Sequence, residues 1–259
     1  MSSLYFAGDT TSYLRIPNTD EFDFGTGDFT IEWYQYQTDL RPFPRIFQVG
    51  TIGVGSGASI GVSIESGSFY YWTNGSSNLV KNIASASYRN KWVHFAICRS
   101  SGVTQVFMDG ISIYSMSDTN NFNGVNDLII GNESSRTNNA AFGGYIAYFS
   151  WIKGVALHTS NFTVPSDFPT ATGDYRLLLT ASSFGGTLGD TNTVENYNVS
   201  TVPELPPSFL PDTVTPKENN LRSMKSLFSN NAMVYYKRGS LAPGGVGSVR
   251  NSSVKSRKT

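Results

Sequence analysis

The chain has 259 residues and a formal net charge of zero at pH 7, and only 15% of its residues are charged, against about 25% in a typical globular protein. Aromatic residues make up 14% of it and there are 25 glycines, which is the composition of short strands joined by turns and excludes a helical bundle. No run of 18 apolar residues predicts a membrane span. The single cysteine, Cys98, excludes an internal disulfide and is expected to be a small buried hydrophobe.

Strands are expected wherever β-branched and aromatic residues alternate with polar ones between Gly, Ser and Pro turns. Before residue 90 the expected strands are 4–6, 13–16, 29–37, 45–49, 58–64, 68–73 and, more weakly, 79–84. We expect Pro17 to end the second strand, because proline cannot donate a hydrogen bond to a ladder. In strand 29–37, Phe29, Ile31 and Trp33 share one face, opposite the even-numbered residues.

The centre of the chain predicts an antiparallel meander of three strands, at 92–98, 103–108 and 111–116. In the first strand the apolar residues 93, 95 and 97 fall on one face and the even-numbered residues on the other. Asp109-Gly110 predicts a type I′ turn, because glycine tolerates the positive φ that this turn requires. In the last strand we expect Ile111 and Ile113 to face away from Ser112 and Tyr114.

The later part of the chain predicts strands at 127–131, 144–151, 175–179 and near 194–199, and one short helical turn within 155–162. Aromatic residues on both faces of 144–151 predict a strand covered by a second sheet and by a loop. Prolines become frequent after Val202, which indicates an extended linker. The capping box TPKE at 215–218 then predicts a short helix with an apolar stripe that includes Leu221, Met224 and Phe228.

Charge is distributed unevenly along the chain. From Thr215 onward there are nine basic residues and one acidic residue, a charge of +8, which leaves ten basic and eighteen acidic residues, or −8, before it. Such a split indicates that the tail contacts an anionic partner, either nucleic acid or the acidic surface of a protein, including another copy of this chain. The candidate contact residues, besides the apolar stripe, are Tyr235, Tyr236, Lys237, Arg238, Arg250, Lys255, Arg257 and Lys258.

Three motifs occur in the order found in one known family. They are DFGTGDFTIEW at 23–33, WVHFA at 92–96 with VFMDGI at 106–111, and LIIG at 128–131 with GGYIAYF at 143–149. These stretches resemble laminin-G-like domains of the concanavalin A-like lectin/glucanase superfamily. The resemblance implies an all-β jelly-roll sandwich of two antiparallel sheets, in agreement with the strand pattern. It predicts one domain at 1–201, followed by a linker, short helix and basic tail at 202–259.

The tail is similar in sequence to a narrower group of proteins. The stretch NAMVYYKRGSLAPGGVGSVRNS at 231–252, with KSRKT at the end, resembles the C-termini of virion proteins of large double-stranded DNA viruses of algae. This resemblance implies a minor capsid or capsid-associated protein whose partners are other capsid subunits, the major capsid protein among them. The N-terminus lacks the basic and apolar regions of a signal peptide, which fits a virion assembled in the host cytoplasm.

Two kinds of ligand site are candidates on the sandwich. Many laminin-G-like domains bind calcium at one rim, and by residue type Asp109, Asp127 and Asn132 could serve, although Asp and Asn are also ordinary turn residues. Tyr70, Trp72 and Asn74 could form a glycan-binding platform, provided that they lie on the outer face of their strand. No other cofactor is expected.

Catalysis is not expected. Glycosidases use two carboxylates, which sandwich glucanases commonly carry as Glu-x-Asp-x-x-Glu on one strand, and no such run occurs here. Glu32 is alone in its strand, His94 is expected to be packed, and His158 lies in a loop without a partner nearby in sequence.

Two hypotheses follow. The first is a non-enzymatic structural virion protein, anchored to capsid subunits by its tail, with nucleic acid as the less favoured tail partner. The alternative is a carbohydrate-binding attachment protein that recognises glycans on a host surface. An ordered tail on neighbouring subunits favours the first hypothesis, and an exposed aromatic platform favours the second.

Overall fold

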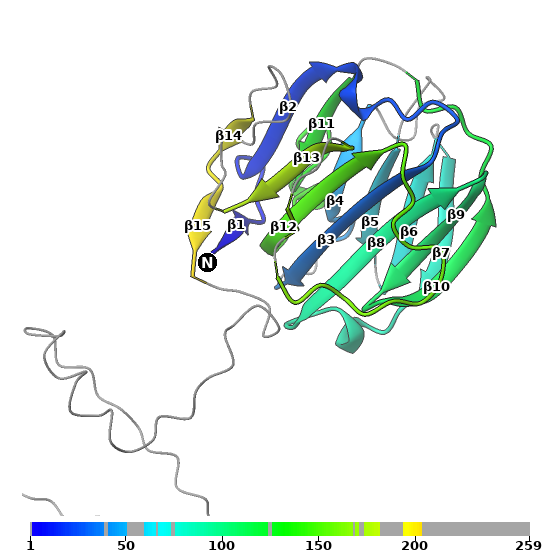
Figure 1. Ribbon diagram of the computed structural model, residues 1–259. Coiled ribbons are helices and arrows are strands. Elements are labelled where there is room, and N and C mark those ends of the chain that lie inside the picture. Colours follow the sequence, from blue (N-terminus) through cyan, green and yellow to red (C-terminus); the bar gives the residue numbers. More distant parts are fainter. Residues whose placement is uncertain are drawn as a thin grey trace, which may run out of the picture. The chain divides into compact units, whose positions relative to one another are not determined.

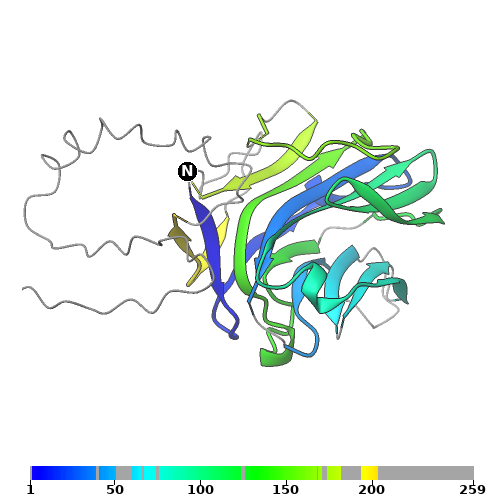
Figure 2. The same ribbon diagram turned by 90° about the horizontal axis from the view of Figure 1, so that it is seen from below.

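The computed structural model describes residues 2–38, 41–50, 60–65, 67–73, 76–123, 126–167, 169–170, 174–181 and 194–203. These residues form fifteen strands and three short 3₁₀ turns, η1 (Asp20–Phe22), η2 (Ser85–Ser87) and η3 (Asn138–Ala140). None of the helices within these ranges is long and apolar enough to cross a membrane. The strands pair into two antiparallel sheets, which Figures 1 and 2 show as two stacked layers.

Sheet A contains eight strands and forms the front layer in Figure 1. In order across the sheet its strands are β10 (Ile111–Ser117), β9 (Val103–Met108), β8 (Trp92–Ser100), β3 (Phe29–Gln37), β12 (Gly143–Lys153), β1 (Ser3–Ala7) and β15 (Ser200–Val202). The eighth strand, β13 (Tyr175–Thr180), pairs with the second half of β12, on the edge whose first half pairs with β1. Strands from both ends of the described chain therefore close this edge of the sheet.

Sheet B contains seven strands. In order they are β14 (Glu195–Tyr197), β2 (Tyr13–Thr19), β11 (Asn126–Ile130), β4 (Arg45–Val49), β5 (Ile60–Glu65), β6 (Ser68–Thr73) and β7 (Ser76–Asn82). Neighbours such as β2 and β11 are far apart in the sequence, as expected for a jelly roll. The predicted sandwich of two antiparallel sheets is confirmed.

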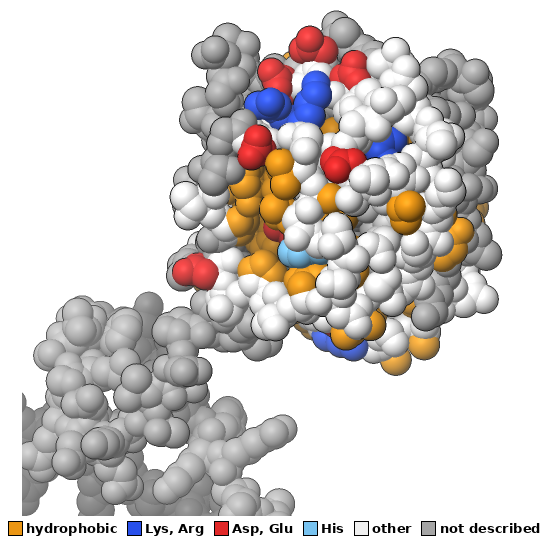
Figure 3. Space-filling view, turned by 45° about the vertical axis from the view of Figure 1, so that its right-hand side comes forward, with side chains coloured by type: hydrophobic (Ala, Val, Ile, Leu, Met, Phe, Trp, Pro, Cys, Tyr) orange, Lys and Arg blue, Asp and Glu red, His pale blue; other side chains and the backbone are white. Residues whose placement is uncertain are grey.

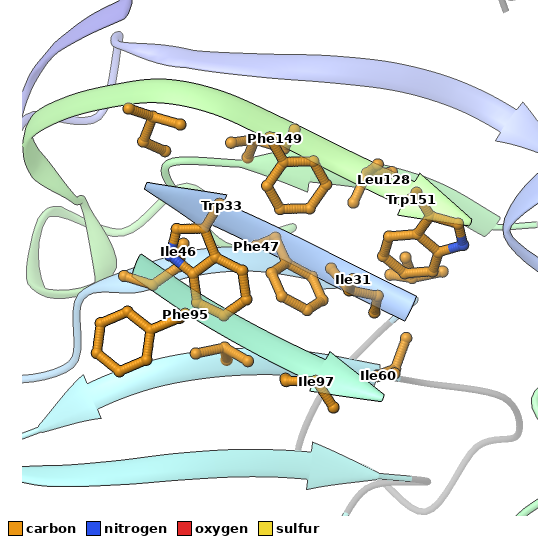
Figure 4. Packing of buried hydrophobic residues seen from close by; sticks show 14 of the residues in the cluster. Ile31, Trp33, Ile46, Phe47, Ile60, Phe95, Ile97, Leu128, Phe149 and Trp151 are labelled. Carbon is orange, nitrogen blue, oxygen red and sulfur yellow. The ribbon is translucent and has the colours of Figure 1, made fainter. Parts of the chain in front are cut away.

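The core lies between the two sheets and is rich in aromatic rings. The ring of Trp33 from sheet A lies 5.7 Å from that of Phe47 in sheet B, and Phe47 also contacts Phe149 and Trp151 edge-on (Figure 4). All four side chains are completely buried. The predicted alternation in strand 29–37 is confirmed, because its odd-numbered apolar residues point into this core.

The central meander is confirmed as β8, β9 and β10. Asp109 and Gly110 both have positive φ, +50° and +77°, as a type I′ turn requires. Cys98 is buried, as predicted. The strand at 144–151 is covered on both faces, with Phe149 towards sheet B and Tyr148 under a loop.

Three expectations about local structure are wrong. Strand β2 continues through Pro17 to Thr19, because the register with β11 shifts between Asn126 and Leu128 and Pro17 falls at that irregularity. In β10 a register shift between Ser112 and Tyr114 breaks the strict alternation, and both Ile113 and Tyr114 pack against the core.

The third expectation concerns residues 155–162, which form no helical turn. The Thr30 hydroxyl donates to the Val155 carbonyl at 2.9 Å and accepts from the Leu157 amide, so the backbone is tied to sheet A instead of to itself. The predicted helix after Thr215 lies outside the described residues. The domain boundary at 201/202 stays a prediction.

Candidate functional site

The outer face of sheet A, here called face A, carries a row of four aromatic side chains. Tyr5, Tyr145, Tyr36 and Trp92 are register partners across β1, β12, β3 and β8. Successive ring centroids are 5.2, 5.7 and 5.8 Å apart. Each ring is partly exposed, so these four residues, the aromatic row, form a continuous apolar strip that is open to solvent.

A polar cluster lies on the same face, built on Glu32 of β3. Its carboxylate oxygen Oε2 is 3.1 Å from Nε2 of His158 and 3.7 Å from Nε2 of His94. His94 Nε2 also lies 3.0 Å from the Tyr148 hydroxyl. We call these four residues the Glu32 cluster. The side chains of Glu32 and His94 are 3% and 0% exposed, whereas His158 is 15% exposed, so His158 connects a buried carboxylate to the surface.

The segment 154–167 crosses face A and holds His158 in place. Tyr34 donates from its hydroxyl to the Pro165 carbonyl at 2.9 Å, and the Phe162 amide donates to the Gly110 carbonyl. The His158 ring stacks on Phe162 with centroids 3.5 Å apart. These contacts fix the imidazole over the Glu32 carboxylate.

The crossing segment leaves part of face A hollowed. Figure 3 shows a hollow bordered by hydrophobic side chains, with an acidic side chain at its bottom and a histidine at its edge. Of the two histidines in the sequence, His94 is fully buried, whereas the side chain of His158 is 15% exposed and lies 3.1 Å from the Glu32 carboxylate. The hollow therefore offers apolar walls and a hydrogen-bond acceptor at its base.

Burial and the Glu32 charge set the protonation states around the hollow. Burial lowers the pKa of His94 to about 4, although Glu32 opposes this shift, so His94 is neutral at pH 7. Burial, followed by the charge of Glu32, raises the pKa of both Tyr148 and Tyr175. Both tyrosines therefore remain protonated and can donate hydrogen bonds.

The Glu32 cluster offers hydrogen-bonding groups to a ligand, and one of them is a carboxylate. Among the described residues around the hollow, the Glu32 cluster contributes one carboxylate, whereas glycoside hydrolysis generally uses two that flank the scissile bond. Burial raises the pKa of the Cys98 thiol to about 11, so this thiol is not a thiolate nucleophile at neutral pH.

The glycan platform predicted from the sequence lies on the opposite side of the sandwich, on the outer face of sheet B (face B). Phe69 and Tyr71 of β6 are buried, whereas Tyr70 and Trp72 point outward, and their rings stack with centroids 5.9 Å apart. Trp72 donates from Nε1 to Ser63, and the Arg45 guanidinium lies 4.8 Å from the Trp72 ring centroid. Asn74 is outside the described residues.

The three residues predicted to bind calcium have separate partners. Asp109 accepts from the His94 amide at 2.9 Å, Asp127 pairs with Arg15 at 2.7 Å, and buried Asn132 accepts from the amide of the next residue. In the ranges that the structure describes, no group of three His, Cys, Asp or Glu residues could hold a metal ion. A calcium site stays a prediction from the resemblance alone.

Sequence reasoning did not find the aromatic row or the Glu32 cluster. Glu32 and His158 are 126 residues apart, and the sequence around His158 contains no partner for it. The one available signal was the alternation in strand 29–37, which placed Glu32 and Tyr36 together on the outer face. The predicted tail residues lie beyond the described part of the chain, so their partners stay predictions.

Comparison with known families agrees with this architecture. The family described as the concanavalin A-like lectin/glucanases superfamily matches residues 8–160, more than half of the chain. The chain therefore belongs to this superfamily. Among curated proteins no sequence gives a significant match.

Two solved structures illustrate the shared fold. A heptameric SAP-like pentraxin from Limulus polyphemus has 12% identity and a TM-score of 0.54, and the match covers 77% of this chain and 94% of that one. A proposed carbohydrate-binding protein from Bacteroides ovatus has 15% identity and a TM-score of 0.56, with 78% of this chain and 60% of that one covered. At such identities the likeness establishes the fold. None of these comparisons supports the resemblance of the tail to virion proteins.

Proposed function

We propose that this chain is a carbohydrate-binding domain and that it binds its ligand on face A. The observation that carries the proposal is the aromatic row beside the hollow of the Glu32 cluster. Sugar rings present apolar C–H faces that stack on aromatic rings, and their hydroxyls need hydrogen-bond partners nearby. Face A supplies both, with apolar rings in a row and polar groups in a concave site.

Membership of the superfamily supports this proposal, because the family description itself names lectins. One structural neighbour is described as a proposed carbohydrate-binding protein, which fits the same class of function. The fold is shared with enzymes as well, so the argument depends on the site and not on the fold.

Face A is a better candidate than face B for two reasons. It has four rings in one row, whereas face B offers the pair Tyr70 and Trp72. The polar groups next to Trp72 are already paired with one another, since Arg45 contacts Glu65 at 2.8 Å and Ser63 donates to the same carboxylate. A ligand on face B would have to displace these contacts, whereas on face A the buried Glu32 is paired with His158, whose side chain is 15% exposed and can itself contact a ligand.

Glycan binding should be tested with a matched pair of variants, Trp92→Ala on face A and Trp72→Ala on face B. We first screen the full chain on a glycan array and then measure its affinity for the best oligosaccharide by titration calorimetry. Loss of the Trp92 ring should weaken binding at least tenfold, about 1.4 kcal/mol, because a stacking surface is removed. Trp72→Ala should change the affinity less than twofold.

Circular dichroism and thermal melts establish that both variants remain folded. The opposite result, a loss of affinity in Trp72→Ala with Trp92→Ala unaffected, would move the site to face B. Failure of the wild-type chain to bind any glycan would overturn the proposal.

A further inference from the structure

The charge around the hollow indicates which sugars it accepts. The ion-pair contacts of Glu32 in the described chain are with His94 and His158. His94 is fully buried and neutral at pH 7. The Glu32 cluster therefore contains no lysine or arginine that could pair with an anionic ligand.

We propose that the hollow on face A selects neutral oligosaccharides and discriminates against acidic ones such as sialylated or uronic acid-containing glycans. This inference rests on the proposed function and defines its ligand class. A carboxylate entering the hollow would lose water and meet Glu32 at its base instead of an arginine or lysine. A neutral sugar would instead donate hydroxyl hydrogen bonds towards that acceptor.

The hydrogen-bonding groups at the hollow point to the same class. The Tyr148 hydroxyl lies within hydrogen-bonding distance of His94, and the raised pKa of Tyr175 reflects its burial and the nearby charge of Glu32. Tyr148 is completely buried and holds His94 in place, whereas the partly exposed phenol of Tyr175 can meet a sugar hydroxyl as donor or acceptor. Like-charged groups brought together in a site screened from water also repel each other more than they do in solution.

The net charge of the residues before Thr215 acts in the same direction. Residues before Thr215 carry a net charge of −8. Close to these residues the field lowers the local concentration of anionic ligands, and added salt screens it, although the +8 of the tail balances this charge in the sum over the full chain. Discrimination against acidic glycans therefore has a local electrostatic contribution from Glu32 and a longer-range one from the net charge of the residues before Thr215.

The experiment compares matched oligosaccharides that differ only in a terminal acidic sugar, for example a neutral lactose-based glycan and its sialylated form, on the full chain. We expect the neutral member to bind at least tenfold more tightly in 0.15 M salt. The E32Q substitution keeps the shape of the side chain and removes its charge. In this variant the ratio of the affinity for the neutral glycan to that for the acidic glycan should fall to about threefold. The matched control E65Q removes a carboxylate from face B and should leave the ratio unchanged.

A second measurement keeps the inference testable if E32Q does not fold. For the wild-type chain, raising the salt concentration from 0.05 to 0.5 M should narrow the ratio, because it weakens charge repulsion. Equal or tighter binding of the acidic glycan, or a ratio that neither E32Q nor salt changes, would overturn this inference while leaving the proposed function intact. No binding to either member of any pair would overturn both.

Discussion

The two outer faces of the sandwich both display aromatic residues, but their polar neighbours differ. On face B, Arg45 and Glu65 pair with each other beside Trp72, so the polar groups there are satisfied within the protein. On face A, the Glu32 cluster lies below a hollow, and His158 connects it to the surface. An exposed aromatic ring alone is therefore a weak sign of a binding site. The stronger sign is an aromatic ring beside polar groups that a ligand can reach.

The segment 154–167 accounts for much of this difference. It crosses face A and is tied down through Thr30 and Tyr34. One of its residues, His158, reaches Glu32, and another, Phe162, stacks on that imidazole. A flat sheet surface thereby acquires a wall, and the aromatic row is left open beside it.

The largest effect should come from disrupting the strand pairing that aligns the aromatic row. Gly144 has φ +144°, and a Cβ at this position would overlap the carbonyl oxygen of Tyr36 in the neighbouring strand. Gly144→Ala should therefore lower the free energy of unfolding by about 4 kcal/mol, since β12 and β3 must separate. Urea unfolding measures this loss.

Gly154→Ala is the matched control, because its φ of +89° is also strained while nothing lies within 4 Å of the added Cβ. Its cost should be about 1 kcal/mol, the usual penalty for a left-handed non-glycine residue. Equal losses in the two variants would show that steric overlap with Tyr36 is not the cause.

The next largest effect is destabilisation at acidic pH, which we expect to arise from His94 beneath face A. Folded His94 has a pKa of about 4, whereas an unfolded histidine titrates near 6.5. Between these values the unfolded chain binds a proton that the folded chain excludes, so the free energy of unfolding decreases as the pH falls from about 6.5 to about 4. The full loss is about 3 kcal/mol, at about 1.4 kcal/mol per pH unit.

This prediction is measured as the difference in the free energy of unfolding between wild type and His94→Gln from pH 7 to pH 4. The difference should shrink on acidification, because the variant has no buried imidazole to protonate. Trp72→Ala on face B should keep the wild-type pH dependence. A constant difference between wild type and His94→Gln would show that His94 does not carry the effect.

Most of the fold could be predicted from the sequence, because strand structure depends on short-range patterns. The period of two in strand 29–37 identified its core-facing residues, and Asp109-Gly110 identified the turn of the central meander. The same alternation set the condition that Tyr70 and Trp72 share one face of their strand, and in the structure that face is the outer one.

The site could not be predicted in the same way, because it depends on register between strands and on one irregularity. Strict alternation would place Tyr145 and Tyr148 on opposite faces of β12. A register shift between Ile146 and Phe149 instead places both on face A, where Tyr145 joins the aromatic row and Tyr148 reaches His94. Nothing in the local sequence fixes that shift.

The smallest predicted effect tests the claim that the polar groups of face B serve stability. Arg45 and Glu65 are about 10% exposed, and their contact is 2.8 Å long. A double-mutant cycle with Arg45→Met and Glu65→Gln should give a coupling energy of about 1 kcal/mol in the free energy of unfolding, since the pair is only partly desolvated. Neither variant should alter glycan affinity by more than twofold. If the coupling is absent and glycan affinity falls instead, then these side chains are held ready for a ligand and face B, not face A, is the binding surface.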